Sequence, residues 1–208
     1  MKVIGVTGNS GSGKSTVSTI IKNNLNCTVI SADNLAKKIN VPGSEYYEKT
    51  IELFGKDILN EDGTINRRKL APILFTDVET KRKMNLLTSK YVGGEIEKLV
   101  NEEKAKANNG FVVIDAPLLF ECGVDKLCDY VIAVTCAEED TKISRICIRD
   151  KITKNQAKIR LEAQPDDEFY TSKADYVIYN NQDTLYITLI KGVIKVIHDI
   201  KDKVKNEK

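Results

Sequence analysis

The sequence predicts an α/β fold in which one parallel sheet of five strands is flanked by helices. Five short apolar segments have the length and composition of buried strands, and the stretches between them carry apolar residues at helical spacing. A glycine-rich loop joins the first of these strands to the first helix. The 208 residues are enough for one such domain with insertions and a sizeable core.

The first strand segment, 2–7, runs into Gly-Asn-Ser-Gly-Ser-Gly-Lys-Ser at 8–15, which fits the phosphate-binding P-loop pattern G-x-x-x-x-G-K-[ST]. The apolar residues that follow share one face of a helix, as the motif requires. Glycines let backbone N–H groups approach a polyphosphate, toward which the helix directs its positive end. The fold class is therefore P-loop NTPase-like, and this context argues against a chance match.

The nucleotide site is expected to hold the phosphates of ATP together with Mg2+. The motif places Lys14 to reach the β- and γ-phosphates and the Ser15 hydroxyl to ligate the metal ion, while Thr16 adds a contact to the α-phosphate. The expected ATP contacts of the loop are Gly8, Gly11, Ser12, Gly13, Lys14, Ser15 and Thr16.

A second strand is expected over 26–31, and Asp33 lies just past its carboxyl end. Ligands of open parallel sheets bind at that edge, so a carboxylate there is well placed to meet an acceptor hydroxyl. An aspartate before a helix is equally typical of an N-cap, which satisfies the first amides of the helix. The residue pattern alone leaves both roles open.

Residues 40–108 are expected to form helices inserted between the second and third strands, far more chain than a crossover needs. The expected helices are 44–54, 65–74 and a long one that starts at a capping box, Thr76-Asp77-Val78-Glu79, and is bent or interrupted at Gly93-Gly94. The excess predicts an acceptor-binding subdomain, with an oligomerisation surface as the alternative. Arg67 and Arg68 suit a substrate phosphate or, as readily, a solvated face.

The third strand, 111–114, ends at Asp115. Four apolar residues followed by aspartate are typical of the partner strand of a P-loop, whose carboxylate lies near Mg2+ or its waters. Pro117 ends regular structure there, so the apolar run Leu118–Phe120, which Glu121 follows, is expected to line a pocket rather than to continue the strand.

A fourth strand is expected over 130–135, followed by a helical segment, 138–164, that is rich in lysine and arginine. Arg145 and Arg149 lie one turn apart on one face of this segment. In kinases a mobile lid closes arginines over the phosphates and stabilises charge on the transferred group. A solvated charged helix is the alternative.

The last part of the chain predicts one more strand and one more helix. The strand, 174–179, ends at Asn180-Asn181, and Asp183 is expected to cap a helix with a buried apolar stripe.

The composition excludes several classes of function. The net charge of +2, from 32 basic and 30 acidic residues, argues against a nucleic-acid-binding surface spread over the whole protein. No apolar run approaches a membrane span, and we expect no signal peptide before the first strand. Five cysteines without C-x-x-C spacing are typical of reduced thiols in the cytoplasm. One histidine supports neither a zinc site nor a Ser-His triad.

With these parts in place, the chain resembles the dephospho-CoA kinase family over nearly its whole length. The P-loop is common to many families, whereas the stretch Asp115-Ala116-Pro117-Leu118-Leu119-Phe120-Glu121 and the order of the other blocks are much more specific. Those other blocks are Thr7–Thr16, Ser31–Asp33 with Ala36, Gly55–Leu59, Asp62-Gly63, Asn66–Leu70, Arg149-Asp150, Arg160 with Gln164, and Ala174–Ile178 with Asn180-Asn181.

The resemblance implies transfer of the γ-phosphoryl group of ATP to the ribose 3′-hydroxyl of dephospho-CoA, the last step of coenzyme A biosynthesis. It implies three parts: a core (about 1–32, 109–137 and 170–208), an acceptor-binding subdomain (about 33–108) and a lid (about 138–169). ATP and dephospho-CoA are the expected partners, Mg2+ the expected cofactor, and a monomer or weak homo-oligomer the expected state.

The resemblance also implies roles for single residues. The catalytic set is Lys14, Asp33 as general base, Asp115 and Arg149. Further ATP contacts are Arg145 and Arg149 from the lid, joined by Arg160 as a lid cation, and Asn180 and Asn181 near the adenine. The acceptor contacts are Asp33, Arg67, Leu118 and Glu121, and the metal contacts are Ser15 directly and Asp115 through water.

Two stretches depart from the family pattern, and two other functions compete with it. Relatives commonly carry Gly-Gly-Ile where this chain has Gly8-Asn9-Ser10, and His-Pro where it has Ser89-Lys90. The second difference bears on the affinity for the acceptor.

The nearest rival function is that of a kinase for another nucleoside or nucleotide. A GTP-dependent switch protein is the more distant one, because Asp115-Ala116-Pro117-Leu118 lacks the glycine of the switch motif D-x-x-G.

Overall fold

The five expected strands are present and form one sheet in the computed structural model, which describes residues 1–106 and 110–207 apart from the side chains of Arg67, Phe75 and Thr76. The strands are β1 (Lys2–Thr7), β2 (Cys27–Ser31), β3 (Phe111–Asp115), β4 (Tyr130–Thr135) and β5 (Tyr176–Tyr179). Their spatial order is β2-β3-β1-β4-β5, and every neighbouring pair is parallel. The predicted fold class is therefore confirmed.

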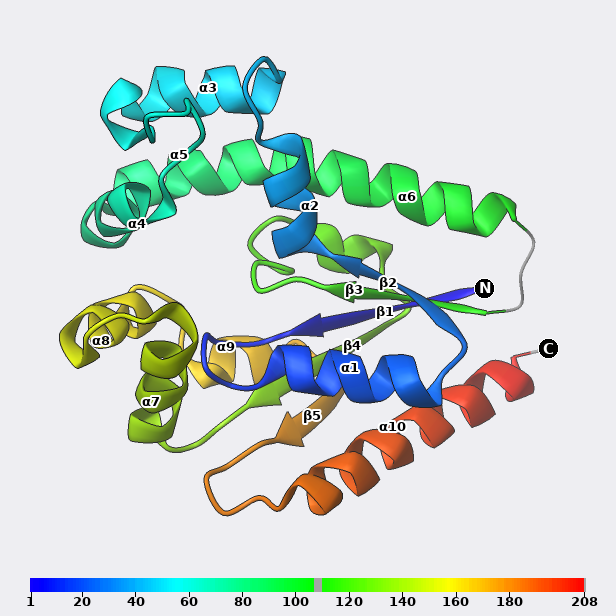
Figure 1. Ribbon diagram of the computed structural model, residues 1–208. Coiled ribbons are helices and arrows are strands. Elements are labelled where there is room, and N and C mark those ends of the chain that lie inside the picture. Colours follow the sequence, from blue (N-terminus) through cyan, green and yellow to red (C-terminus); the bar gives the residue numbers. More distant parts are fainter. Residues whose placement is uncertain (107–109, 208) are drawn as a thin grey trace.

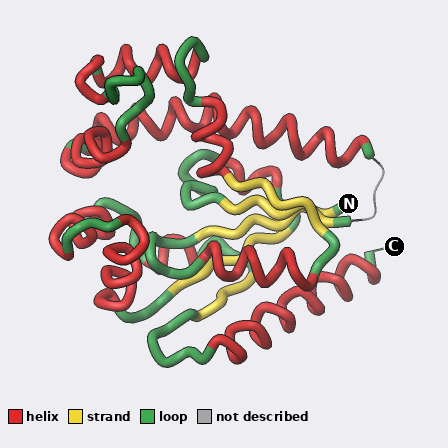
Figure 2. The backbone as a smooth tube through the Cα atoms, viewed as in Figure 1, coloured by secondary structure: helices red, strands yellow, loops and turns green. Residues whose placement is uncertain are grey.

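Helices surround this sheet (Figure 2). They are α1 (Lys14–Asn24), α2 (Ala32–Ile39), α3 (Glu45–Phe54), α4 (Arg67–Thr76), α5 (Val78–Thr88), α6 (Gly94–Ala105), α7 (Glu139–Asp150), α8 (Lys154–Glu162), α9 (Asp167–Thr171) and α10 (Tyr186–Asn206). Shorter turns are the 3-10 helices η1 (Lys56–Ile58) and η3 (Val124–Leu127) and the π-helix η2 (Ser89–Gly93). Within the described ranges, no helix is both long and apolar enough to cross a membrane.

Two apolar cores lie on opposite faces of the sheet, because successive strand residues point to alternate sides. Helices α1 and α10 cover one face, where Ile4 of β1 packs with Val17 of α1 and Val193 of α10. Helix α6 lies across the other face, where Val3 of β1 packs with Ile96 (Figure 1). The sheet is thus buried on both sides, and the carboxyl ends of its strands point toward the side of the molecule that carries α7 and α8 (Figure 1), the edge at which parallel sheets bind ligands.

The inserted helices stand away from the sheet at one end of α6 (Figure 1). Helices α5 and α6 are joined without a loop through the π-helix η2, so the interruption expected at Gly93-Gly94 is a widened turn inside one long rod. The expected capping box is wrong, because α5 is capped by Asp77, whose carboxylate accepts from the N–H groups of Glu79 and Thr80.

Two other helix boundaries differ from the prediction. The segment 138–164 is two helices rather than one, because the chain turns at Lys151, the only non-glycine residue in the described ranges with a positive φ (54°). The last helix begins at Tyr186 and its N-cap is Leu185, so the expected cap at Asp183 is wrong. Helices α7 and α8 pack together over a small separate cluster that contains Ile146 and Ala157.

Candidate active site

The P-loop wraps the carboxyl end of β1, and three of its glycines adopt backbone angles that other residues rarely do. Gly8, Gly11 and Gly13 have φ of 137°, 79° and 99°. A Cβ atom would collide with the carbonyl of Val134 at Gly8 and with the side chain of Asn180 at Gly13, and at Gly11 it would lie 2.5 Å from a backbone oxygen of α7. The loop is therefore glycine-rich because neighbouring strands and helices press against it on three sides.

Lys14 begins α1 and turns its side chain back into the loop. Its Nζ donates to the backbone oxygens of Gly8 at 2.7 Å and Asn9 at 2.9 Å, and the residue is 8% exposed. Burial lowers the pKa of Lys14 to about 8, although the nearby charges of Asp115 and Asp33 oppose this shift. Among the described residues no carboxylate contacts this ammonium directly, so the cation is suited to neutralise an incoming phosphate.

Two carboxylates come to the same edge of the sheet. Asp115 ends β3 and is paired in register with Ser31 of β2 on one side and Val6 of β1 on the other, so it lies between Asp33 and the P-loop. Burial raises the pKa of Asp115, while the charge of Lys14 opposes the shift. The charges of both Asp115 and Asp33 act on Lys14, so the two carboxylates lie at the same edge of the sheet as the P-loop lysine.

Asp33 is not the cap of its helix, which resolves one alternative left open above. The N-cap of α2 is Ser31, whose hydroxyl accepts from the N–H of Asn34 at 3.4 Å. Asp33 lies in the first turn of α2 and is exposed. Its charge contributes to the pKa of Lys14, Arg149 and Arg160, so it lies within electrostatic range of all three.

The oxygen donors expected to hold Mg2+ suit that ion. Ser15 and Thr16 are exposed in the first turn of α1, directly after Lys14, and the carboxylate of Asp115 lies across the loop. Mg2+ is commonly bound by one or two protein oxygens together with substrate phosphates. These donors fit that pattern, and they lie at the N-terminus of α1, whose positive end suits an anionic ligand.

Arg145, Asn180 and Asn181 hold the backbone around the P-loop. Arg145 Nη1 donates to the backbone oxygens of Gly11 at 3.1 Å and Asn180 at 2.9 Å. Asn180 Nδ2 donates to the backbone oxygen of Ser12 at 2.9 Å, and Asn181 Oδ1 accepts from the N–H of Ala137 at 3.0 Å. Each of these predicted ATP-site residues therefore lies at the nucleotide loop or at the adjoining ends of β4 and β5.

Two arginines of α7 and α8 share one carboxylate. Arg149 Nε and Nη2 donate to the two oxygens of Asp150, both at 2.8 Å, and Arg160 Nη1 donates to Asp150 Oδ2 at 2.6 Å. The hydrogen bonds from Arg149 hold the pKa of Asp150 below its usual range. Two cations are thus fixed side by side above the carboxyl edge of the sheet.

The residues assigned to the acceptor differ in how far the structure describes them and in how deeply they are buried. Arg67 begins α4, and its side chain lies outside the described part of the structure. Leu118 is partly exposed, but Leu119 is fully buried against Gly5 of β1, so the expectation that the whole run 118–120 lines a pocket is wrong for Leu119. The buried part of the run 118–120 belongs to the hydrophobic core, because it covers the face of the sheet beneath it.

Glu121 follows that run and is half-buried. Its Oε1 accepts from the hydroxyl of Tyr170 at 3.2 Å, and burial raises its pKa. Ser89 begins the π-helix and donates to the backbone oxygen of Cys122 at 2.7 Å, which ties the inserted helices to the stretch after β3. The position that departs from the family pattern therefore has a structural partner of its own.

Three polar residues at the P-loop lay outside the sequence prediction of the site. Asp167 of α9 contacts Asn9, Gln164 after α8 contacts Ser10, and Lys142 of α7 contacts Asp167, as described below. The available signal was slight: Lys142 lies one turn before Ile146 on the buried face of α7, where a lysine is unusual.

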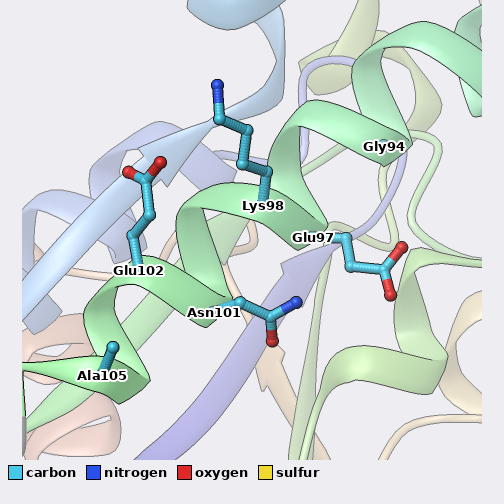
Figure 3. Close-up of a pocket in the computed structure, with 6 residues that line it drawn as sticks. All are labelled: Gly94, Glu97, Lys98, Asn101, Glu102 and Ala105. Carbon is cyan, nitrogen blue, oxygen red and sulfur yellow. The ribbon is translucent and has the colours of Figure 1, made fainter.

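One groove lies on α6, away from this site. It has a volume of about 540 Å3 and is lined by six residues of α6 alone, which project from the helix in Figure 3. These residues are Gly94, Glu97, Lys98, Asn101, Glu102 and Ala105. A second groove of about 280 Å3 follows the free edge of β2 from Thr28 to Ser31. Neither contains a residue of the P-loop.

Comparisons with known proteins agree with the geometry. The family model described as dephospho-CoA kinase matches residues 2–185. A dephospho-CoA kinase of Listeria innocua is 38% identical over 183 residues, covering 87% of this chain and 89% of the relative. The solved dephospho-CoA kinase from Campylobacter jejuni is 30% identical with a TM-score of 0.65 and covers 97% of this chain and 98% of that one.

A more distant comparison shows the fold alone. A shikimate kinase from Bacteroides thetaiotaomicron superposes with a TM-score of 0.56 at 12% identity, covering 96% of this chain and 98% of that one. The fold is thus that of the P-loop kinases, while the family model and the more similar relatives name one activity. On these matches, together with a P-loop lysine flanked by Asp33 and Asp115, the chain belongs to the dephospho-CoA kinase family.

Proposed function

We propose that this chain transfers the γ-phosphoryl group of ATP to the 3′-hydroxyl of dephospho-CoA and releases ADP and CoA. The observation that carries the proposal is the grouping of Asp33 and Asp115 around the P-loop lysine at the carboxyl edge of the sheet. In the reaction the 3′-oxygen forms a bond to the γ-phosphorus while the bond from that phosphorus to the β–γ bridging oxygen breaks. The hydroxyl proton passes to Asp33, and ADP leaves with the bond electrons.

The nucleotide is held by the P-loop. Backbone N–H groups of Gly11 and Gly13 and the start of α1 face the β- and γ-phosphates, and Lys14 exchanges its two carbonyl partners for phosphate oxygens. Ser12 Oγ is buried without a hydrogen-bond partner in the described structure, as is Asn9 Oδ1. A buried hydroxyl in this position gains a partner when phosphate oxygens enter the loop, which supports the assignment of Ser12 to the ATP site.

Mg2+ is proposed to bind at Ser15, with Asp115 acting through a water molecule. The ion, when bound, offsets the negative charge that the β- and γ-phosphates bring together. The chain fixes the positions of both oxygen donors. Ser15 is held in the first turn of α1, and Asp115 is held by its register in the sheet. The alternative role of Asp115 is to orient the acceptor rather than the metal waters.

The acceptor is proposed to enter between the P-loop and the inserted helices. Asp33 faces its 3′-hydroxyl, with Arg67, Leu118 and Glu121 as further contacts. The half-buried carboxyl of Glu121 with its raised pKa is suited to a neutral or donor group rather than to a phosphate. Residues 33–108 then form the acceptor-binding part, and 138–169 the lid.

The lid arginines are proposed to stabilise the transferred group. The transition state of phosphoryl transfer spreads charge over the equatorial oxygens, so fixed cations and positioning supply most of the rate. Arg149 is 53% exposed in its side chain and bound only to Asp150 among the hydrogen bonds of the described structure, so one face of its guanidinium is open to a phosphate. Arg145, Asn180 and Asn181 hold the nucleotide end of the site.

The setting of the reaction is also a proposal. The five cysteines are free thiols, which supports a reducing compartment such as the cytoplasm. A monomer or weak homo-oligomer, without nucleic-acid or membrane partners, stays a prediction.

An acceptor screen tests the proposed function. ADP release is measured with Mg-ATP alone and with dephospho-CoA, adenosine, AMP and shikimate, and the products are identified by mass. The expected result is ADP release that depends on dephospho-CoA and equals the CoA formed. ADP release with another acceptor only would keep the kinase fold and overturn the acceptor, and Ser89-Lys90 would then be the first positions to exchange.

A further inference from the structure

Asn9 and Ser10, the two P-loop residues between Gly8 and Gly11, are tied to a distant part of the chain. Asn9 Nδ2 donates to Asp167 Oδ1 at 3.1 Å. The N–H of Ser10 donates to Gln164 Oε1 at 2.8 Å, and Gln164 Nε2 donates back to the Ser10 hydroxyl at 2.8 Å. Both loop residues are buried, so these bonds are shielded from water and link the loop to the segment after α8.

The carboxylate that holds Asn9 also holds a buried ammonium. Asp167 Oδ2 accepts from Lys142 Nζ at 2.7 Å, and the Lys142 side chain is 8% exposed. One oxygen of Asp167 therefore serves the loop and the other serves α7. A buried cation fixes its partner strongly, because loss of that partner would leave an unpaired charge in a poorly solvated place.

Helix α7 contacts the next loop residue directly. A Cβ at Gly11 would lie 2.5 Å from the backbone oxygen of Lys142, and Arg145 Nη1 donates to the backbone oxygen of Gly11 at 3.1 Å. Three consecutive loop residues, Asn9 to Gly11, are thus held by side chains or backbone from α7 and from the segment that follows α8.

These contacts reach the P-loop lysine through Asn9. The backbone oxygen of Asn9 accepts from Lys14 Nζ at 2.9 Å, while its side chain is fixed by Asp167. A rotation of this residue would displace the carbonyl that receives Lys14 and the neighbouring loop amides together. The geometry of the phosphate cradle therefore depends on residues that lie more than 100 positions later in the chain.

We propose that Lys142, Asp167 and Gln164 are positioning residues for the nucleotide site. They act through Asn9 and Ser10 and set the loop amides and Lys14 in the arrangement that receives the β- and γ-phosphates. The inference rests on the proposed function only in that the loop binds a nucleotide. It extends that function by assigning to the base of the proposed lid a role in nucleotide affinity, separate from that of Arg149 in stabilising charge.

The test measures nucleotide binding directly, by titration of Mg-ADP into the full-length chain without acceptor. The variants are Asn9→Ala, Ser10→Ala, Gln164→Ala and Asp167→Asn. The control is Tyr130→Phe, which removes one part-buried hydroxyl bond, to Glu207 at 3.2 Å, at the opposite edge of the sheet. Thermal unfolding without nucleotide is recorded for every variant, and KM is measured for ATP and for dephospho-CoA.

The expected result is a rise of about tenfold in Kd for Mg-ADP and in KM for ATP, with KM for dephospho-CoA nearly unchanged. Tyr130→Phe is expected to lower thermal stability without a change in Kd. Because Asn9 and Asp167 act through one contact, Asn9→Ala added to Asp167→Asn should weaken binding little further.

A change in Kd no larger than that of Tyr130→Phe would overturn the proposal, since the contacts would then be merely structural. Ser10→Ala keeps the backbone bond to Gln164 and so keeps the test open if Asp167→Asn fails to fold. If the unchanged chain binds Mg-ADP but forms no CoA from dephospho-CoA, the proposed function fails while this role can still be tested on Kd. If the unchanged chain forms CoA and the variants bind Mg-ADP as tightly as it does, this role fails and the proposed function stands. The two failures are therefore distinguished by the binding titration.

Discussion

Arg149 and Asp150 are neighbours at the end of α7 and form a two-pronged ion pair, with Nε donating to Oδ1 and Nη2 to Oδ2, both at 2.8 Å. Asp150 thereby holds the guanidinium plane in one orientation, and Arg160 donates to the same carboxylate. The hydrogen bonds that Arg149 donates to Asp150 raise the pKa of Arg149, and the charge of Asp33 adds to the shift. A planar, oriented guanidinium is the group best matched to phosphate oxygens.

Replacement of this arginine tests its proposed role in the transition state. Arg149→Ala is expected to lower kcat by about 100-fold or more, because a cation that meets the developing charge is lost. Arg149→Lys keeps the charge but loses the fork, so it should recover only part of that rate. Steady-state kinetics with saturating ATP and dephospho-CoA provide the measurement. A kcat for Arg149→Ala within twofold of the unchanged chain would remove Arg149 from the mechanism.

The lowered pKa of Lys14 predicts a pH dependence of ATP binding. Phosphate favours the charged ammonium, whereas burial in the free protein gives Lys14 a pKa of about 8. As the pH rises through that value the free protein loses the proton, so affinity for ATP should fall by about tenfold for each further pH unit. At pH values below that pKa, where Lys14 stays protonated, the affinity for ATP should not change with pH because of this residue.

The control for this profile is Lys14→Arg, whose guanidinium stays charged throughout. Its affinity for ATP, although weaker, should stay flat over the same range of pH. Direct binding titrations at a series of pH values decide the matter. An unchanged chain that binds ATP equally well one and two units above the pKa would show that Lys14 does not meet the phosphates in its charged form.

Much of this site could be predicted from sequence because it depends on local patterns. The P-loop motif places Lys14 and Ser15, and the ends of apolar strands place Asp33 and Asp115 at one edge. Parallel strands bring such ends together whatever the rest of the chain does. The cap of α2 shows the limit of the approach: Ser31 and Asp33 both suit an N-cap, and only the backbone geometry decides for Ser31.

The parts that were missed depend on contacts between distant segments. No local pattern joins Ser10 to Gln164 or Asn9 to Asp167, because the packing of α7 and α8 on the loop decides both pairs. The break between α7 and α8 falls on Lys151, which has a positive φ. A glycine at this position would have indicated the end of the helix in the sequence, whereas a lysine does not. The role of Leu119 in the core, rather than in a pocket, likewise follows from its contact with Gly5 across the sheet.

Because Asn180 lies so close to Gly13, we expect a methyl group added at Gly13 to affect ATP binding, whereas one added at an uncrowded glycine should not. In Gly13→Ala the new Cβ would collide with Asn180 Nδ2 and the backbone would be strained at φ of 99°. Gly43→Ala is a matched control, since φ is 85° there and no atom lies within 4 Å of the added Cβ. Both changes should reduce the free energy of unfolding by about 1–2 kcal/mol through strain.

Only Gly13→Ala should in addition abolish ATP binding, because the loop must move to accommodate the methyl group. Thermal unfolding and ATP titration on both variants separate strain from collision. If Gly13→Ala bound ATP as tightly as Gly43→Ala, the close approach of Asn180 would be irrelevant to the nucleotide site.

The most direct test of the account is Asp33→Asn, measured by single-turnover formation of CoA from ATP and dephospho-CoA together with the Kd for ATP. The change keeps the shape of the side chain and leaves Ser31 as the cap of α2, so the fold should persist. The rate of CoA formation is expected to fall by about 100-fold or more with ATP affinity nearly intact, because a general base is lost. An unchanged rate of CoA formation would rule out Asp33 as the base and with it the proposed mechanism.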